Sequence, residues 1–325
     1  MHTYDTLQAA NAVKDGKTIS LQEDVSLSKI VTIEKGTGYY TIDGNGYTIS
    51  MAENADCGAF YFKKQFLPVG NTEYPKFMLK NVTVEGFVGD KIFDTTYYVI
   101  NSSECKLNIQ GCRFTNNSGI SIWPSQVTNL RVSDCTFESN KAAAIAYNTD
   151  GRINVENCMF NDNTINGSGV IYYTTKTDGY DVIRNNMFSN NTVTYSGNAA
   201  VVYLSYSVED LSGNLFIDNS VTVDGTSSKE GVIVLGTMAG VTNINGNAFV
   251  KNTLGTVTTK YATVYAGTKC DVSNNYWGDG EDGEMSREFG KDIWYTYFAV
   301  TKTSYAKSYE VNSNGRGVTV TTATE

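Results

Sequence analysis

Short runs of alternating apolar and polar residues follow one another along the chain, and one pattern of positions recurs. An aliphatic residue precedes two polar residues, then Cys or Asn, any residue, an aromatic residue, and Asn three positions later. The pattern occurs at 109–117, 132–140, 155–163, 183–191, 211–219, 244–252 and 272–280, with weaker copies at 42–50 and 79–87. Alternation with period 2 in segments rich in Val, Ile, Thr and Tyr predicts β-strands rather than helices.

The recurring positions define files of like residues. The aliphatic file consists of Ile42, Leu79, Ile109, Val132, Val155, Ile183, Leu211, Ile244 and Val272. The aromatic file consists of Tyr47, Val84, Phe114, Phe137, Phe160, Phe188, Phe216, Phe249 and Trp277. Between them lie Asn45, Val82, Cys112, Cys135, Cys158, Asn186, Asn214, Asn247 and Asn275, and a last file holds Asn117, Asn140, Asn163, Asn191, Asn219 and Asn252. Fixed positions joined by loops of varying length indicate a solenoid.

The residue types specify which solenoid. Like residues in files require each coil to lie in parallel register on the previous one, about 4.8 Å away. Stacked Asn side chains can then bond one another as a ladder, and Asn tolerates the left-handed turns that a corner needs. The shortest coil has 23 residues, which suits three short strands and three corners. We therefore predict an all-β, right-handed parallel β-helix of about nine coils, because right-handed crossovers dominate parallel sheets.

The two ends depart from the repeat. We expect the β-helix domain to span 1–290, with an N-terminal cap over 1–41 that contains a short capping helix from Asp5 to Lys14, marked by the capping pair Asp5 and Gln8. The segment 59–69 is expected to be a hydrophobic excursion that folds over the core. Residues 291–325 predict two alternating strands around Asn314-Gly315, as C-terminal cap strands or the start of a truncated following domain.

Composition excludes several classes of function. The 325 residues carry a net charge of −9, which argues against partners such as nucleic acid and anionic membranes. No apolar run reaches the roughly 18 residues of a transmembrane helix, so we expect no membrane insertion. The N-terminus has no charged-then-apolar leader, so we expect a cytosolic chain or a mature fragment without its signal. The single histidine, His2, leaves no residue for Ser-His-Asp, Cys-His or His-ligated metal chemistry.

Two groups of residues raise the question of a metal site or disulfides. In the file of Cys112, Cys135 and Cys158, thiols one coil apart point the same way, whereas a disulfide needs them turned toward each other and zinc needs a fourth ligand. We interpret them as buried core thiols. The acidic loop at 279–284 does not have the spacing of an EF-hand and is interpreted as a solvated turn. No metal and no cofactor are expected.

An enzyme is the weaker interpretation. Glycosidases need two facing carboxylates, and the sequence has no Asp-Asp pair. A lyase would need a Lys or Arg base with acidic ligands, but Arg113, Arg131, Arg152 and Arg184 stand at different offsets from their aromatic residues. We therefore assign no catalytic residue, and fold analogy alone favours an enzyme.

Aromatic residues end a second strand in most coils. These strands fall at 119–123, 143–147, 169–173, 199–203, 231–235 and 261–265, and their last residues include Trp123, Tyr147, Tyr173, Tyr203 and Tyr265. Alternation with small apolar positions favours exposure, so these five residues form our candidate ligand-binding stripe, suited to sugar rings. The alternative is that they cover the core or pack under loops.

The repeated NCxFxxN coils and the closing NNYWG resemble right-handed parallel β-helix repeat proteins. More narrowly, they resemble the adhesin-like surface proteins of gut methanogenic archaea and gut Gram-positive bacteria, whose N-terminal cap and first coil are similar to YDTLQAANAVKDGKTISLQEDVSL…YTIDGNGYTIS. The resemblance covers about residues 4–280 and implies a monomeric, secreted or cell-surface module, a non-enzymatic adhesin or glycan binder. Its partner would be a host, cell-wall or plant polysaccharide or a cell-surface glycan. A polysaccharide lyase acting on acidic polysaccharide and a passive structural stalk are the alternatives.

Overall fold

Strands are the only regular elements in the part of the chain that the structure, a computed structural model, describes. That part comprises residues 15–65, 73–93, 96–126, 128–147, 151–174, 181–205, 208–224, 230–236, 242–255, 264–266, 270–278, 293–295 and 306–322. The expected helix from Asp5 to Lys14 and the acidic loop at 279–284 lie outside these residues. The chain divides into two compact units, Met1–Ile153 and Asn154–Glu325, and each is described by itself.

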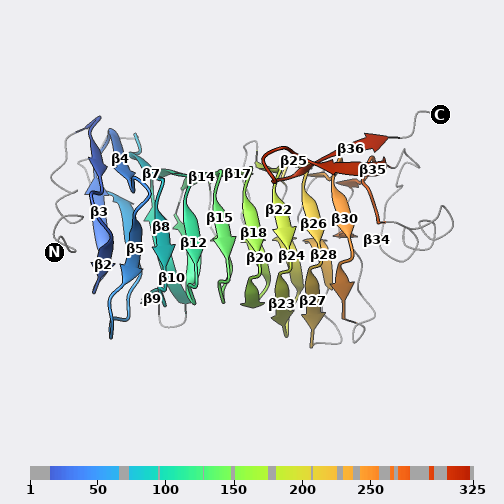
Figure 1. Cartoon of the computed structure of the whole chain (residues 1–325), viewed down its shortest axis with the longest axis horizontal. Helices are drawn as coiled ribbons and strands as arrows, with labels where there is room; N and C mark the ends of the chain where they lie inside the picture. Colours follow the sequence, from blue (N-terminus) through green and yellow to red (C-terminus); the bar gives the residue numbers. More distant parts are fainter. Residues whose placement is uncertain are drawn as a thin grey trace. The chain divides into compact units, whose positions relative to one another are not determined.

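The first unit contains three parallel sheets (Figure 1). In order of pairing, sheet A has β1 (Thr18–Ser20), β4 (Tyr39–Asp43), β7 (Lys76–Lys80), β11 (Lys106–Gln110) and β14 (Asn129–Ser133). Sheet B has β2 (Val25–Leu27), β5 (Thr48–Met51), β8 (Thr83–Glu85), β12 (Arg113–Thr115) and β15 (Thr136–Glu138). Sheet C has β3 (Val31–Lys35), β6 (Phe60–Lys64), β10 (Thr96–Ser103), β13 (Ile120–Ser125) and β16 (Ile145–Tyr147), and β9 (Asp90–Phe93) pairs antiparallel with β10.

The second unit repeats this plan and adds a fourth parallel sheet. Sheet A has β17 (Ile153–Glu156), β21 (Val182–Arg184), β25 (Asp210–Ser212), β29 (Thr242–Asn243) and β33 (Cys270–Asp271). Sheet B has β18 (Met159–Asn161), β22 (Met187–Ser189), β26 (Leu215–Ile217) and β30 (Ala248–Val250). Sheet C has β20 (Gly169–Tyr173), β24 (Ala199–Leu204), β28 (Glu230–Leu235), β32 (Val264–Ala266) and β34 (Ile293–Tyr295). Sheet D has β19 (Thr164–Asn166), β23 (Thr192–Tyr195), β27 (Ser220–Val223) and β31 (Thr253–Leu254).

The predicted files of like residues are confirmed within each unit. In the first unit, Ile42 pairs with Leu79, Leu79 with Ile109, and Ile109 with Val132. In the second, the rings of Phe160 and Phe188 stack 4.6 Å apart at 5°, and the stack continues through Phe216, Phe249 and Trp277. Parallel register holds these rings one strand separation apart, which is why they stack face to face rather than edge to face.

Buried asparagines form the expected ladders. In the second unit, the backbone N–H and Nδ2 of Asn163 both donate to Oδ1 of Asn191, at 3.2 and 2.8 Å, and the bonds repeat through Asn219 to Asn252. A second ladder runs through Asn186, Asn214, Asn247 and Asn275. From Asn186 onward, each Nδ2 in the two ladders also donates to a backbone carbonyl of the preceding coil, as Asn191 does to Phe160 at 2.9 Å. The ladders therefore satisfy polar groups that burial would otherwise leave unpaired.

Two expectations about the first coils are wrong. Tyr47 was expected to precede Val84 in the aromatic file. Instead Ile49 pairs with Val84, because the corner at Gly44–Gly46 is two residues longer than the corners of later coils. The segment 59–69 was expected to fold over the core as an excursion. Its residues 60–64 instead form β6, a regular strand of sheet C in which Phe60 and Phe62 are buried, because their alternation with polar residues fits the pleat.

The two strands predicted near the C-terminus form an antiparallel hairpin, β35 (Ala306–Val311) and β36 (Val318–Thr322). Within the second unit it packs against the outward side of sheet B (Figure 1). Leu215, Ala248 and Val250 of sheet B form one buried cluster with Ala306 and Val318 of the hairpin. The backbone N–H of Val318 donates to Gly213 O at 2.8 Å, and Nη1 of Arg316 donates to Asn157 O at 2.8 Å. The hairpin, referred to below as the clasp, thus covers apolar side chains that face away from the coil interior.

Candidate functional site

The expected aromatic stripe is corrected at its centre. Tyr173 is fully buried, and its hydroxyl donates to Oδ2 of Asp181 at 2.8 Å. Its register partner is Leu204, whereas the neighbouring Tyr172 pairs with Tyr203. The sequence offered two consecutive tyrosines, and only the partner strand decides which of them points outward.

The remaining members of the stripe do not share one environment. In the first unit Trp123 is half-buried, and its ring lies 4.7 Å from that of the buried Tyr98. Tyr147 ends β16, and its side chain lies outside the described part of the structure. Tyr265 is only 4% exposed and packs with Ala200 and Val234. Tyr265 therefore agrees with the alternative interpretation, in which the aromatic residues cover the core.

Three tyrosines of the second unit form an accessible group, here called the tyrosine cluster: Tyr172, Tyr195 and Tyr203. The rings of Tyr172 and Tyr203 lie 5.2 Å apart between centroids, with a 35° tilt, on adjacent strands of sheet C. Tyr195 ends β23 of sheet D, is 37% exposed, and lies against Gly197, where an added Cβ would be 2.6 Å from Cε1 of the ring. Of these three tyrosines, only Tyr203 belongs to the stripe predicted from the sequence.

Polar groups of the cluster are held close together. Nδ2 of Asn198 donates to the Tyr203 hydroxyl at 3.4 Å. Burial raises the pKa of Tyr172, and the nearby hydroxyls of Tyr203 and Tyr195 raise it further because like charges would repel. The Tyr172 hydroxyl therefore stays protonated at neutral pH. Tyrosine hydroxyls both donate and accept hydrogen bonds, so the cluster offers polar edges beside partly exposed ring faces.

A family model describing a right-handed β-helix region matches residues 32–193 and 69–277. The chain belongs to the right-handed β-helix family. Among solved structures, this β-helix is similar to one titled "Crystal structure of Agl-KA catalytic domain", with 13% identity and a TM-score of 0.27, over 82% of this chain and 64% of that chain. The chain therefore spans less than two thirds of that chain's length. No curated protein matches it.

The described cysteines of this β-helix are buried structural residues. Cys57, Cys105, Cys112, Cys135 and Cys158 are all free thiols inside the coils. Burial raises the pKa of Cys105 to about 12, and burial beside Cys135 raises that of Cys112 well above the usual range. Among the residues that the structure places, no three His, Cys, Asp or Glu side chains gather as metal ligands. In the same residues no helix is long and apolar enough to span a membrane.

Two of the arginines weighed as candidate bases form ion pairs between neighbouring coils. Arg113 pairs with Glu138 in the first unit, and Nη2 of Arg184 lies 2.6 Å from Oε1 of Glu156 in the second. In each pair the two side chains come from adjacent strands of one sheet. Arg184 and Glu156 are register partners, and Arg113 and Glu138 lie on the paired strands β12 and β15. These arginines therefore neutralise the charge of adjacent coils.

Glu230 is the one carboxylate in the described ranges with a buried, unbonded oxygen. Its Oε2 accepts a hydrogen bond from the Val223 N–H at 2.9 Å, whereas Oε1 has no partner there. Burial raises its pKa to about 7, with the backbone bonds from Val223 and Gly255 acting in the opposite direction. Because the side chain has no exposed surface, it cannot contact a ligand from solvent.

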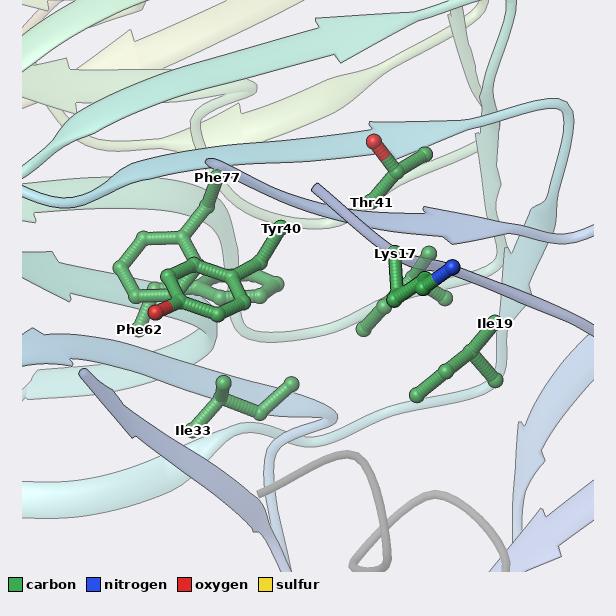
Figure 2. A pocket seen from close by; sticks show the side chains of 8 residues that line it. Lys17, Ile19, Ile33, Tyr40, Thr41, Phe62 and Phe77 are labelled. Carbon is green, nitrogen blue, oxygen red and sulfur yellow. The ribbon is translucent and has the colours of Figure 1, made fainter. Parts of the chain in front are cut away.

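A small apolar space lies within the first coils of the first unit. Figure 2 shows the rings of Tyr40, Phe62 and Phe77 grouped on one side of it, with Ile33 below them. The ring centroids of Phe62 and Phe77 lie 5.2 Å apart, and the Tyr40 hydroxyl is bonded to Thr37 O. The free space is about that of one water molecule, so it is a feature of core packing and not a site for a sugar ring.

Proposed function

We propose that this β-helix is a non-enzymatic, adhesin-like module, secreted or displayed at a cell surface, that binds glycans through the tyrosine cluster. The observation that carries the proposal is the pairing of Tyr172 with Tyr203 on adjacent strands, with both rings partly exposed. An aromatic ring offers an apolar face to the C–H groups of a sugar, and its hydroxyl edge offers hydrogen bonds.

The setting of the cluster supports binding. Tyr172 and Tyr203 lie on strands of sheet C. The residues next to them on these strands, Ile171, Tyr173 and Leu204, are fully buried and fix the backbone in place. A ligand would therefore not have to order the backbone beneath it, which lowers the entropic cost of association. Asn198 adds an amide that can bond a sugar hydroxyl beside the rings.

The partner class follows from these groups. Stacking surfaces with neutral hydrogen-bonding edges fit a polysaccharide or a cell-surface glycan, of host, cell-wall or plant origin. We propose that the module binds as a monomer, since Tyr172, Tyr203 and Asn198 all come from one chain.

The experiment is a glycan array followed by titration calorimetry of the bound glycans. The double variant Tyr172→Ala/Tyr203→Ala is expected to bind at least tenfold more weakly, a loss of about 1.4 kcal/mol or more. Tyr47→Ala is the matched control, since Tyr47 is also half-buried but lies at a corner of the first unit. Tyr173→Ala is unsuitable, because removing a buried ring bonded to Asp181 would perturb folding.

Each outcome decides between the candidate functions. Unchanged binding by a correctly folded double variant would remove the tyrosine cluster as the site. Formation of unsaturated sugars from acidic polysaccharides, read as ultraviolet absorbance, would favour a lyase instead. An array without any bound glycan would leave the stalk as the better account.

A further inference from the structure

Two tyrosines on adjacent coils of the second unit are positioned to react with each other. Tyr172 of β20 and Tyr203 of β24 are register partners in a parallel sheet, so their side chains leave neighbouring strands in the same direction. Their ring centroids are 5.2 Å apart, close to the strand separation of about 4.8 Å. The rings therefore stand at nearly the same height above the sheet, with corresponding ring edges beside each other.

Solvent reaches both rings of this pair. Each side chain is half-buried, and on the far side of Tyr203 the register partner is Val234 of β28, which has no hydroxyl. The rings of Tyr276 and Tyr309 also lie close together, 5.0 Å apart, but Tyr276 is only 7% exposed and the two rings are tilted by 47°. Of these two tyrosine contacts, the one between Tyr172 and Tyr203 is therefore the one that an external oxidant can reach at both rings.

Asn198 holds the Tyr203 hydroxyl in a way that oxidation preserves. Its Nδ2 donates to the hydroxyl oxygen at 3.4 Å. A tyrosine hydroxyl both donates and accepts hydrogen bonds, and the amide uses only the accepting oxygen. Loss of the hydroxyl hydrogen therefore leaves this bond intact, and the oxidised ring stays beside Tyr172.

We propose that Tyr172 and Tyr203 are a site of oxidative coupling, where a peroxide acting through a haem peroxidase joins the two rings into dityrosine. The product is a covalent staple between adjacent coils. The proposal rests on the geometry of the tyrosine cluster and needs no bound glycan, so it goes beyond the function proposed above and does not depend on it.

The reaction balances with hydrogen peroxide as the oxidant. Each hydroxyl gives up one electron and one proton, and the two electrons and two protons reduce one peroxide to two waters. The two phenoxyl radicals carry part of their unpaired electron on the Cε atoms next to the hydroxyls, where a Cε–Cε bond forms. The hydrogen on each bonded Cε then moves, through water, to the phenoxyl oxygen and restores the hydroxyl. The chain loses two hydrogen atoms in total.

The fold favours coupling within one molecule over coupling between molecules. Groups that are held in contact react as if they were at a very high local concentration. The neighbouring strand residues Ile171 and Leu204 are fully buried, so the backbone beneath the two rings stays in place. The product also closes a loop in the unfolded chain, which lowers the entropy of that state as a disulfide does. Coupled protein should therefore resist unfolding better than uncoupled protein.

The test treats the parent chain and the variants Tyr172→Phe, Tyr203→Phe and Tyr195→Phe with hydrogen peroxide and a haem peroxidase at low protein concentration. Phe keeps each ring but cannot form a phenoxyl radical, and Tyr195→Phe is the matched control within the same cluster. Monomers are isolated by gel filtration, and their dityrosine is measured by fluorescence. We expect Tyr172→Phe and Tyr203→Phe to form about tenfold less dityrosine than the parent, and Tyr195→Phe to form as much as the parent.

Mass spectrometry and urea unfolding then locate the link and measure its effect. In the coupled parent monomer, trypsin should release residues 153–176 joined to residues 185–229, with two hydrogen atoms fewer than the two separate peptides. Fragmentation should place the bond at Tyr172 and Tyr203. Treatment should also raise the urea midpoint of the parent relative to that of Tyr172→Phe.

Three results would overturn the proposal. The first is a treated parent monomer without the linked peptides. The second is a link at Tyr195, or between Tyr276 and Tyr309, in place of the expected one. The third is a treated parent that unfolds at the same urea concentration as treated Tyr172→Phe. Failure here is distinguishable from failure of glycan binding, because coupling is measured without a glycan and glycan binding is measured on untreated protein.

Discussion

The backbone N–H of Cys158 donates to Oδ1 of Asn186 at 2.8 Å, the same bond that the Asn186 N–H makes to Asn214 at 3.0 Å. In the first unit the Cys112 N–H points to Sγ of Cys135 at 3.4 Å. Cysteine and asparagine thus occupy equivalent positions at one corner of the coil. A thiol is a weaker acceptor than an amide oxygen. Hydrogen bonds between coils at this corner are therefore weaker where the acceptor is a cysteine than where it is an asparagine.

The ladder predicts a graded response at Asn214. Asn214→Ala leaves the buried N–H of Asn186 without its acceptor and removes the side-chain bonds of Asn214 to Ile183 O and to Asn247, which should lower the free energy of unfolding by about 2–5 kcal/mol. Asn214→Cys should cost at least 1 kcal/mol less, because sulfur still accepts one bond. Urea unfolding measures both, and the exposed Asn166→Ala is the control, expected within about 0.5 kcal/mol of the parent. Equal costs for Ala and Cys would refute the equivalence.

The files could be predicted from sequence because every coil repeats the same packing problem. Phe114 stacks on Phe137, and Phe188 on Phe216, since like side chains at one strand separation are mutually compatible. What could not be predicted is register within a single coil. Tyr172 and Tyr173 are equivalent in sequence, and only the pairing with β24 decides which is buried.

The sequence also did not predict that the clasp covers the outward side of sheet B. Met187, Leu215 and Ala248 occupy one outward file of sheet B, where polar residues are the norm. Their partner is the clasp, which begins 58 residues after Ala248. Nothing in a local pattern indicates that a distant segment returns to cover it.

The buried thiols should be chemically silent in the native state. In a Cys270→Ser background, iodoacetamide at pH 8 should not modify Cys57, Cys105, Cys112, Cys135 or Cys158 within an hour, and should modify all five after urea unfolding. Burial both blocks access and raises the pKa of Cys105, so the reactive thiolate is scarce. Mass spectrometry counts the adducts, and rapid native labelling at any of these positions would contradict the burial.

The clasp should depend on Gly317. An added Cβ there would lie 2.5 Å from Asn185 Cα, a backbone atom that cannot move aside, and φ is +69°. Gly315 has the same φ but no atom within 4 Å of such a Cβ, so Gly315→Ala is a matched control for backbone strain alone.

We expect Gly317→Ala to detach the clasp, expose Leu215 and Val250, and increase binding of a hydrophobic dye. Limited proteolysis should then cleave near residue 312 well before it cleaves the coils. Gly315→Ala should bind the dye as the parent does and lose only about 1 kcal/mol of stability. Equal behaviour of the two variants would mean that the approach of Gly317 to Asn185 does not hold the clasp.

Glu230 should make the second unit less stable as pH rises. Its pKa is about 7 in the folded chain, against an ordinary value of 4.5, so between these pH values the folded state binds a proton that the unfolded state has released. Stability therefore falls as pH rises through this window, by a total on the order of 3 kcal/mol, and is flat above and below it for this group.

Glu230→Gln keeps an acceptor for the Val223 N–H but cannot ionise, so it should match the parent near pH 4.5 and exceed it at pH 8. Urea unfolding across the range measures the difference, with the exposed Glu310→Gln expected to follow the parent curve. A Glu230→Gln curve parallel to that of the parent from pH 4.5 to 8 would show that the buried carboxylate does not control this dependence.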